Sequence, residues 1–163
     1  MPKDGGIGAS SKRREDVRFL TGAGNYTDDI NIRGQAYVYF LRSDVAHGTL
    51  NSVDTSAASS MPGVVQIFTG ADFEAIGGIP CGWQVTDKHG EPMQEPKHPV
   101  LAHGKVRHVG EPIAAIVADT LAQARDAAEA IDVDISELPA VINMKAAAAD
   151  GATKVHDLSL IHI

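Results

Sequence analysis

Residues 98–120, HPVLAHGKVRHVGEPIAAIVADT, constrain the fold of this chain more than any other stretch. Glycines and prolines break the first half into turns, and an apolar run without polar alternation follows at 113–118. Such a strand is expected to be buried on both faces. Thr120 then stands at the N-cap position of a helix over 121–130. Four residues of that helix are spaced as one face: Leu121, Ala124, Arg125 and Ala128.

The remaining elements are short and alternate between β-prone and helical segments. Strands are predicted at 35–43, 50–53, 64–69 and 131–135, and short helices at 55–61, 71–76 and 143–149. Residues 1–34 are Gly-rich and polar and are expected to be mostly extended or looped. Residues 77–99 hold four prolines and four glycines and predict a long loop. The order predicts an α+β domain, with a mixed sheet and a few short helices.

Composition excludes several classes of protein. The chain has 163 residues, enough for one domain, and a net charge of −7, which makes nucleic acid an unfavourable partner. No apolar run approaches the ~18 residues that span a bilayer, and the N-terminus lacks the apolar region of a signal peptide. The single cysteine excludes an intrachain disulfide. The cytoplasm is the expected location.

Few residues are candidates for chemistry. Cys81 could act as a nucleophile with one of the seven histidines, but a lone cysteine is more often a small, partly buried apolar residue. His98, His103 and His108 recur every five residues, a spacing that converges on one metal in neither a strand nor a helix. Gly22 and Gly24 lack the third glycine of a dinucleotide fingerprint. We therefore predict no catalytic, cofactor-binding or metal-binding residue.

An interface is the sharper expectation. Residues 107–112, RHVGEP, place charged and aromatic tips on a rigid turn just before the buried strand. Polar groups on a rigid turn are suited to contact with another domain. The alternative is that this turn only connects the loop to the strand and has no partner. One residue at the end of the first strand and one just after it are added, so the predicted interface residues are Arg42, His47, Arg107, His108 and Glu111.

Several motifs together resemble one enzyme family. The likeness runs from about residue 6 to residue 157, and its motifs are 17–22 (VRFLTG), 24–29 (GNYTDD), 41–43 (LRS) followed by 46–47 (AH), 61–64 (MPGV) and 110–120. In this combination the chain resembles the start of the molybdenum-binding large subunit of the xanthine dehydrogenase, aldehyde oxidase and carbon monoxide dehydrogenase family. Residues 80–84 and 95–109 look most like the carbon monoxide dehydrogenase type. The resemblance implies an α/β hammerhead domain.

The resemblance also implies a function for a longer protein. The full enzyme would oxidise carbon monoxide, an aldehyde, a purine or another heterocycle at a molybdopterin centre, with water as the oxygen source. Electrons would leave through 2Fe-2S clusters to FAD. The implied partners are the rest of the large subunit, an iron–sulfur small subunit and a FAD medium subunit. The cofactor-binding loops and the catalytic glutamate belong to later domains, so this chain is expected to be inactive alone.

The resemblance sets the expected domain boundaries and leaves alternatives open. They are an extended segment at 1–34, the hammerhead domain at 35–150, the start of a linker at 151–157, and a tail at 158–163 (LSLIHI) that looks non-native. One alternative is a free-standing module with the same fold that binds a protein partner. Another is a small cysteine hydrolase that uses Cys81.

Overall fold

The computed structural model describes residues 13–156, so the expected tail at 158–163 and the first 12 residues lie outside this range. The described residues fall into two compact units, one up to Gln35 and the other from Ala36 onward. The first unit holds a short helix, α1 (Asp16–Leu20), and a single 3-10 turn, η1 (Thr27–Asp29). These two short turns are the helical parts of a segment that was predicted to be mostly extended or looped.

Local contacts explain both helical turns of the first unit. Arg13 Nε lies 3.0 Å from the Asp16 carboxylate at the start of α1. The Asp29 side chain accepts a hydrogen bond of 2.8 Å from the backbone N–H of Tyr26 and so closes η1. The ring of Tyr26 stacks on that of Phe19, with centroids 5.5 Å apart. Such short-range pairs stabilise turns too brief to give a periodic pattern.

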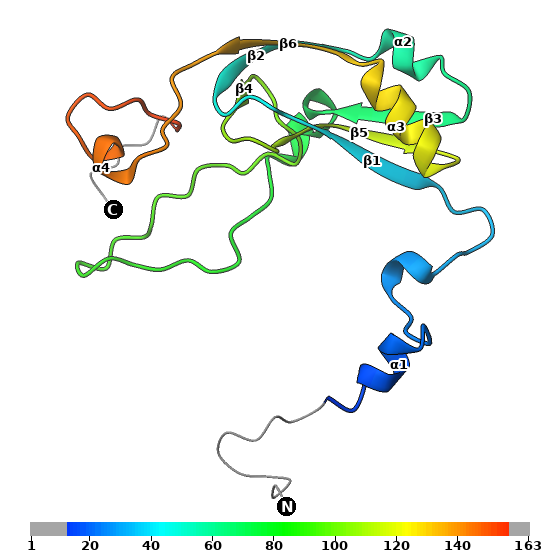
Figure 1. Cartoon of the computed structure of the whole chain (residues 1–163). Coiled ribbons are helices and arrows are strands. Elements are labelled where there is room, and N and C mark those ends of the chain that lie inside the picture. The colour runs from blue at the N-terminus through cyan, green and yellow to red at the C-terminus, as the bar shows by residue number, and fades with distance from the viewer. Residues whose placement is uncertain (1–12, 157–163) are drawn as a thin grey trace, which may run out of the picture. The chain divides into compact units, whose positions relative to one another are not determined.

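The second unit contains two three-stranded antiparallel sheets (Figure 1). In the first sheet β5 (Pro112–Ala118) lies between β1 (Tyr37–Arg42) and β3 (Val64–Thr69). In the second sheet β2 (Gly48–Asp54) lies between β4 (Lys105–Val106) and β6 (Asp132–Glu137). The predicted burial of the apolar strand is confirmed by β5, in which four consecutive residues, 113–116, are buried. Strand β4 was not predicted, because two residues are too few to show alternation.

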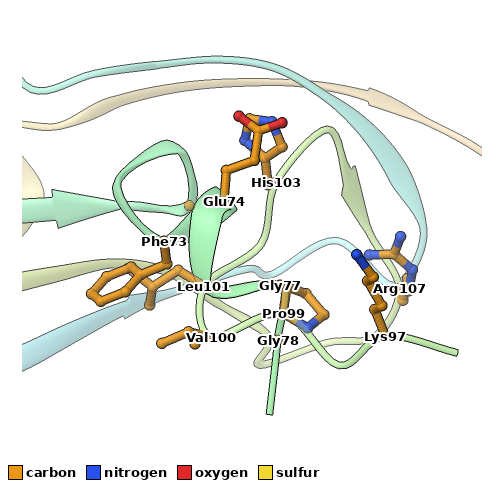
Figure 2. Close-up of a pocket in the computed structure, with 11 residues that line it drawn as sticks. Phe73, Glu74, Gly77, Gly78, Lys97, Pro99, Val100, Leu101, His103 and Arg107 are labelled. Carbon is orange, nitrogen blue, oxygen red and sulfur yellow. The ribbon is translucent and has the colours of Figure 1, made fainter. Parts of the chain in front are cut away.

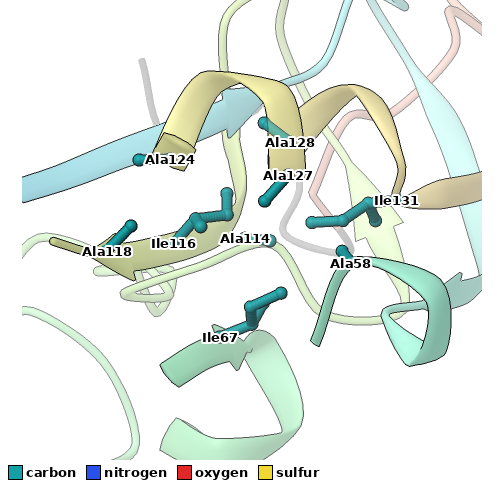
Figure 3. Close-up of a cluster of buried hydrophobic side chains, with 9 residues drawn as sticks. All are labelled: Ala58, Ile67, Ala114, Ile116, Ala118, Ala124, Ala127, Ala128 and Ile131. Atoms are coloured by element: carbon teal, nitrogen blue, oxygen red, sulfur yellow. The ribbon is translucent and has the colours of Figure 1, made fainter. Parts of the chain in front are cut away.

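One helix covers the first sheet. Helix α3 (Leu121–Glu129) begins after Thr120, whose Oγ1 accepts from the backbone N–H of Gln123 at 3.2 Å, as the N-cap prediction requires. The core between helix and sheet consists mainly of alanine and isoleucine (Figure 3), namely Ala58, Ile67, Ala114, Ile116, Ala118, Ala124, Ala127, Ala128 and Ile131. Alanines let the helix backbone approach the sheet closely. The predicted face was wrong in part, since Leu121 and Arg125 are exposed and Ala127 is buried.

Three short helical segments complete the second unit. Helix α2 (Ser56–Ser59) buries Ala58, and at its start the backbone N–H of Ser56 donates to Asp54 Oδ1, which holds the pKa of that carboxyl below its usual range. The 3-10 helix η2 (Gly70–Ile76) follows β3 directly. Helix α4 (Met144–Ala147) is capped by Asn143 Oδ1, which accepts from two backbone N–H groups.

The predicted long loop has an internal order that the sequence did not indicate. Residues 77–100, called the arm below, run outward and return antiparallel, with isolated bridges between Ile79 and His98 and between Thr86 and Pro92. Figure 1 shows the arm extending away from the two sheets. Near its middle, the backbone N–H of Cys81 donates to Glu95 Oε1 at 2.6 Å. The bridge between Ile79 and His98 therefore holds the two ends of the arm together where they join the rest of the second unit.

Candidate functional site

Glu111 is the centre of the turn that leads into β5. Its side chain is buried, and its carboxylate accepts a short hydrogen bond from the backbone N–H of Arg107. Arg107 Nη1 and His108 Nδ1 each lie 3.9 Å from a carboxylate oxygen of Glu111. Gly110 has a φ of +84°, a conformation that favours glycine, and allows the chain to fold back over the carboxylate. Three of the five predicted interface residues therefore meet at this turn.

Arg42 joins the end of β1 to the same turn. Its Nη1 donates to the carbonyl oxygen of Gly110 at 2.8 Å, and its guanidinium carbon lies 5.7 Å from the centroid of the Phe40 ring. Backbone bonds reinforce the link, because Ser43 donates to the Glu111 carbonyl and accepts from Gly110. The structure thus brings Arg42, Arg107, His108 and Glu111 into one cluster.

His47 makes its contacts elsewhere. Its ring is buried, and Nδ1 lies 2.9 Å from the carbonyl oxygen of Pro139, while Nε2 is enclosed without a hydrogen-bond partner in the described part of the chain. The backbone carbonyl of His47 also accepts from Leu138 at 2.8 Å. Buried side chains such as those of His47 and Glu111 can shape a surface only through their neighbours. The interface role of the five residues stays a prediction.

A pocket that the sequence did not indicate lies between η2, the base of the arm and Arg107 (Figure 2). Its volume is about 190 Å³. The residues around it come from four segments and are Gly70, Phe73, Glu74, Gly77, Gly78, Lys97, Pro99, Val100, Leu101, His103 and Arg107. Because these residues are far apart in sequence and follow no common period, only the folded chain brings them together.

The pocket has an apolar wall and two cations. Figure 2 draws Phe73, Val100 and Leu101 toward one side and Lys97 and Arg107 toward the other. Arg107 Nη1 donates to the Lys105 carbonyl at 3.2 Å, whereas its Nε is enclosed and has no acceptor among the described residues.

The residues considered for cysteine and metal chemistry are not arranged for it. Cys81 is exposed, and its Sγ donates to the backbone carbonyl of Trp83 at 3.1 Å. His98 Nδ1 lies 3.2 Å from the Pro99 carbonyl, while His103 borders the pocket and His108 lies beside Glu111. Within residues 13–156 no three His, Cys, Asp or Glu side chains are grouped so that they could hold a metal ion.

Comparison with known proteins identifies the domain. The family model described as "Aldehyde oxidase and xanthine dehydrogenase, a/b hammerhead domain" matches residues 21–139. The chain belongs to this hammerhead family. The predicted family and fold class are therefore confirmed, with the sheet resolved into the two antiparallel sheets described above.

Individual relatives are much longer than this hammerhead chain. It is 39% identical over 137 residues to a nicotine 6-hydroxylase large subunit of Paenarthrobacter nicotinovorans, covering 84% of this chain and 16% of the relative. It is 35% identical over 139 residues to a carbon monoxide dehydrogenase large chain of Afipia carboxidovorans, covering 85% and 16% respectively. The chain thus spans about 16% of the length of these relatives.

A solved structure gives the same result in three dimensions. The crystal structure of quinoline 2-oxidoreductase from Pseudomonas putida 86 matches with a TM-score of 0.76 and 39% sequence identity, over 92% of this chain and 18% of that chain.

None of the helices within residues 13–156 has the length and apolar character needed to cross a membrane.

Proposed function

We propose that this chain is the front part of the large subunit of a molybdenum hydroxylase, where it packs against other domains and has no activity alone. The observation that carries the proposal is the hammerhead match over 21–139 in a chain that spans only 16% of relatives named as large subunits. The relatives are named for nicotine, carbon monoxide, xanthine and aldehydes, so the domain is compatible with each of these substrates.

The redox chemistry belongs, in this proposal, to parts of the enzyme beyond these residues. The whole large subunit would bind molybdopterin, and partner subunits would hold 2Fe-2S clusters and FAD, in a cytoplasmic complex that takes its oxygen from water. One relative is named as a molybdenum-binding subunit. The described residues of this chain offer no grouped ligand set for a metal, so we assign no step of the oxidation to them.

The outer face of the first sheet supports a packing role. Val38 and Phe40 alternate with inward-facing residues of β1 and are 49% and 42% exposed. They pair in register with Val117 and Ala115 of β5, so their side chains share one face of the sheet. A solvated sheet face normally carries polar residues. An apolar one fits a domain covered by further protein better than it fits a free-standing module.

The Glu111 turn lies at the end of this face. Arg42, which extends over Phe40, and His108 are both exposed and could pair with acidic groups of a neighbouring domain. Glu111 would act by holding the turn in shape from inside. We therefore place the predicted interface at this turn and on the Val38 and Phe40 face together.

The first test is to sequence the source DNA beyond the codon for residue 157. We expect an open frame that continues into pterin-binding domains with a glutamate near the end. A stop codon directly after residue 163 would instead favour the free-standing module. The purified 163-residue chain is expected to oxidise neither aldehydes nor xanthine with a dye as electron acceptor.

The second test uses the complete large subunit read from that frame. Phe40→Asp and Arg42→Glu should each reduce the amount of iron–sulfur and FAD subunits that co-purify with it. Ala122→Asp, at an exposed position of α3, is the control and should leave assembly unchanged. Normal assembly of both variants would show that this face is not an interface with the partner subunits.

A further inference from the structure

We propose that the arm, residues 77–100, inserts Trp83 into an apolar groove of the polypeptide that follows this domain in the large subunit. The inference rests on the proposed function, because it needs that polypeptide to exist, and it adds which surface the polypeptide covers. Three observations carry it. The arm is ordered by its own hydrogen bonds, it exposes apolar side chains, and the chain leaves the domain on the side to which the arm extends.

The inner half of the arm is held by one carboxylate. Glu95 Oε1 accepts from the backbone N–H of Cys81 at 2.6 Å, and Glu95 Oε2 accepts from Gln84 Nε2 at 2.7 Å. Cys81 and Gln84 stand on either side of Trp83 in the sequence, and Glu95 reaches them from the returning half of the arm. These two bonds therefore fix the stretch of backbone that carries the indole ring.

The outer half of the arm is closed by local bonds of the same kind. The backbone N–H of Met93 donates to the carbonyl of Val85 at 2.9 Å. Beyond this pair, Asp87 Oδ1 accepts from the backbone N–H groups of His89 and Glu91, at 2.7 and 3.0 Å. The arm thus has a defined shape without a core of its own. A segment that is already ordered loses less conformational entropy when it binds.

The arm presents apolar side chains to solvent. Trp83 is 78% exposed, and Val85 and Met93, which are joined through their backbones, are exposed as well. Single exposed apolar residues are common on any protein. Three of them on one short ordered hairpin form a surface that water solvates poorly, and tryptophan is among the residues most enriched at the centre of protein interfaces. The arm therefore has the composition of a contact surface.

The chain leaves the domain toward the arm. Figure 1 shows the arm and α4, both in the second unit, extending to the same side of the two sheets. The stretch that leads into α4 is apolar and exposed too, since Ile142 is 93% exposed and Met144 is the first residue of the helix. The relatives extend far beyond the part that this chain matches. A polypeptide that continues from α4 can cover both apolar sets.

The small size of this surface favours a partner in the same polypeptide. A stable interface between separate proteins buries about 1,200–2,000 Å² in total. One aromatic side chain buries about 150–250 Å², so Trp83 with Val85 and Met93 supplies only part of such an area. A domain attached to the same chain is present at a high effective concentration and needs less contact area. We therefore assign the groove to the large subunit itself, not to a partner subunit or to a second copy.

Cys81 gives a readout two residues from Trp83. It is the single cysteine of the 163-residue chain, and it is exposed. The test compares the rate at which iodoacetamide alkylates Cys81 in this chain and in the complete large subunit, measured by mass spectrometry of the peptide that contains it. Docking of the arm should slow alkylation in the complete subunit by at least about tenfold. An equal rate in the two proteins would overturn the proposal.

Two variants of the complete subunit show whether the indole ring causes the protection. Trp83→Ser should restore most of the alkylation rate. Gln94→Ser, which changes an exposed polar residue of the arm, should leave Cys81 protected. In the 163-residue chain Trp83→Ser should keep the urea midpoint of the wild type, because the ring lies outside the core. Protection that survives Trp83→Ser would contradict the assignment.

A photo-crosslink in the assembled enzyme identifies what covers the arm. With p-benzoylphenylalanine in place of Trp83, we expect a crosslink to a large-subunit peptide beyond residue 157. A crosslink to the iron–sulfur subunit, the FAD subunit or residues 1–157 of a second copy would overturn the proposal, as would no crosslink at all. The DNA sequence tests the proposed function separately. If the frame continues past residue 163 and Cys81 remains fully reactive, only the present inference fails.

Discussion

Glu111 is the residue whose removal should disturb the fold most directly. Its buried carboxylate accepts from the Arg107 backbone, so Glu111→Ala would leave a donor unpaired in a place that water barely reaches. We expect a loss of about 1–3 kcal/mol in the free energy of unfolding, measured by urea denaturation. Glu111→Gln, which keeps an acceptor oxygen, should lose less.

The comparison for this prediction is Glu129→Ala, at an exposed position at the end of α3. It should change the free energy of unfolding by no more than a few tenths of a kcal/mol, about the value for surface substitutions. If Glu111→Ala and Glu129→Ala unfold at the same urea concentration, the carboxylate of Glu111 does not hold the turn.

Individual residues could be placed correctly from the sequence where their partners are close to them along the chain. The turn at 107–112 could be identified because glycine, proline and charged residues stand next to each other before an apolar strand. The pocket could not, because Phe73, Lys97 and Arg107 are brought together by the antiparallel return of the arm. Likewise, nothing in the sequence indicated that His47 would be buried against Pro139.

Helix α3 buries three alanines and offers a matched pair of substitutions. Ala127 is fully buried against the first sheet, whereas Ala122 is exposed on the other side of the same helix. Ala127→Leu inserts three carbon atoms into a filled space and should lower the free energy of unfolding by about 1–3 kcal/mol. Ala122→Leu adds the same atoms toward solvent and should be nearly neutral.

Urea denaturation of the two variants measures the difference. Equal unfolding midpoints for Ala127→Leu and Ala122→Leu would mean that the helix does not lie against the sheet as described. The wild-type chain provides the reference, and far-UV circular dichroism checks that helix content is retained in both variants.

The elements that the sequence predicted best are those with strong apolar runs. Strand β3 has the bounds that were predicted, and β1 and β5 differ by one or two residues at their ends. The buried face of α3 was predicted to begin at Leu121. In the structure the row of buried residues begins one turn later, at Ala124, and ends at Ile131, just beyond the helix. Helix α1 was missed because five residues are too few to display a period of 3.6.

For the whole molecule, the division of the described residues into two units leads to a testable expectation. The core that joins α3 to the first sheet uses only residues from Tyr39 onward, with Tyr39 and Leu41 of β1 packed at its edge. A fragment of residues 36–163 therefore keeps every strand of both sheets and the whole core. It should fold cooperatively, with a urea midpoint close to that of the complete chain.

A second fragment gives this prediction its contrast. Residues 48–163 lack β1, which forms one edge of the first sheet and pairs with β5 from Tyr37 to Arg42. Its loss exposes Ile116 and neighbouring core residues and leaves the central strand with one partner, so this fragment should show no cooperative transition. If instead residues 36–163 also lose the transition, the first 35 residues contribute to the core of the second unit. The domain would then begin well before the predicted boundary at residue 35.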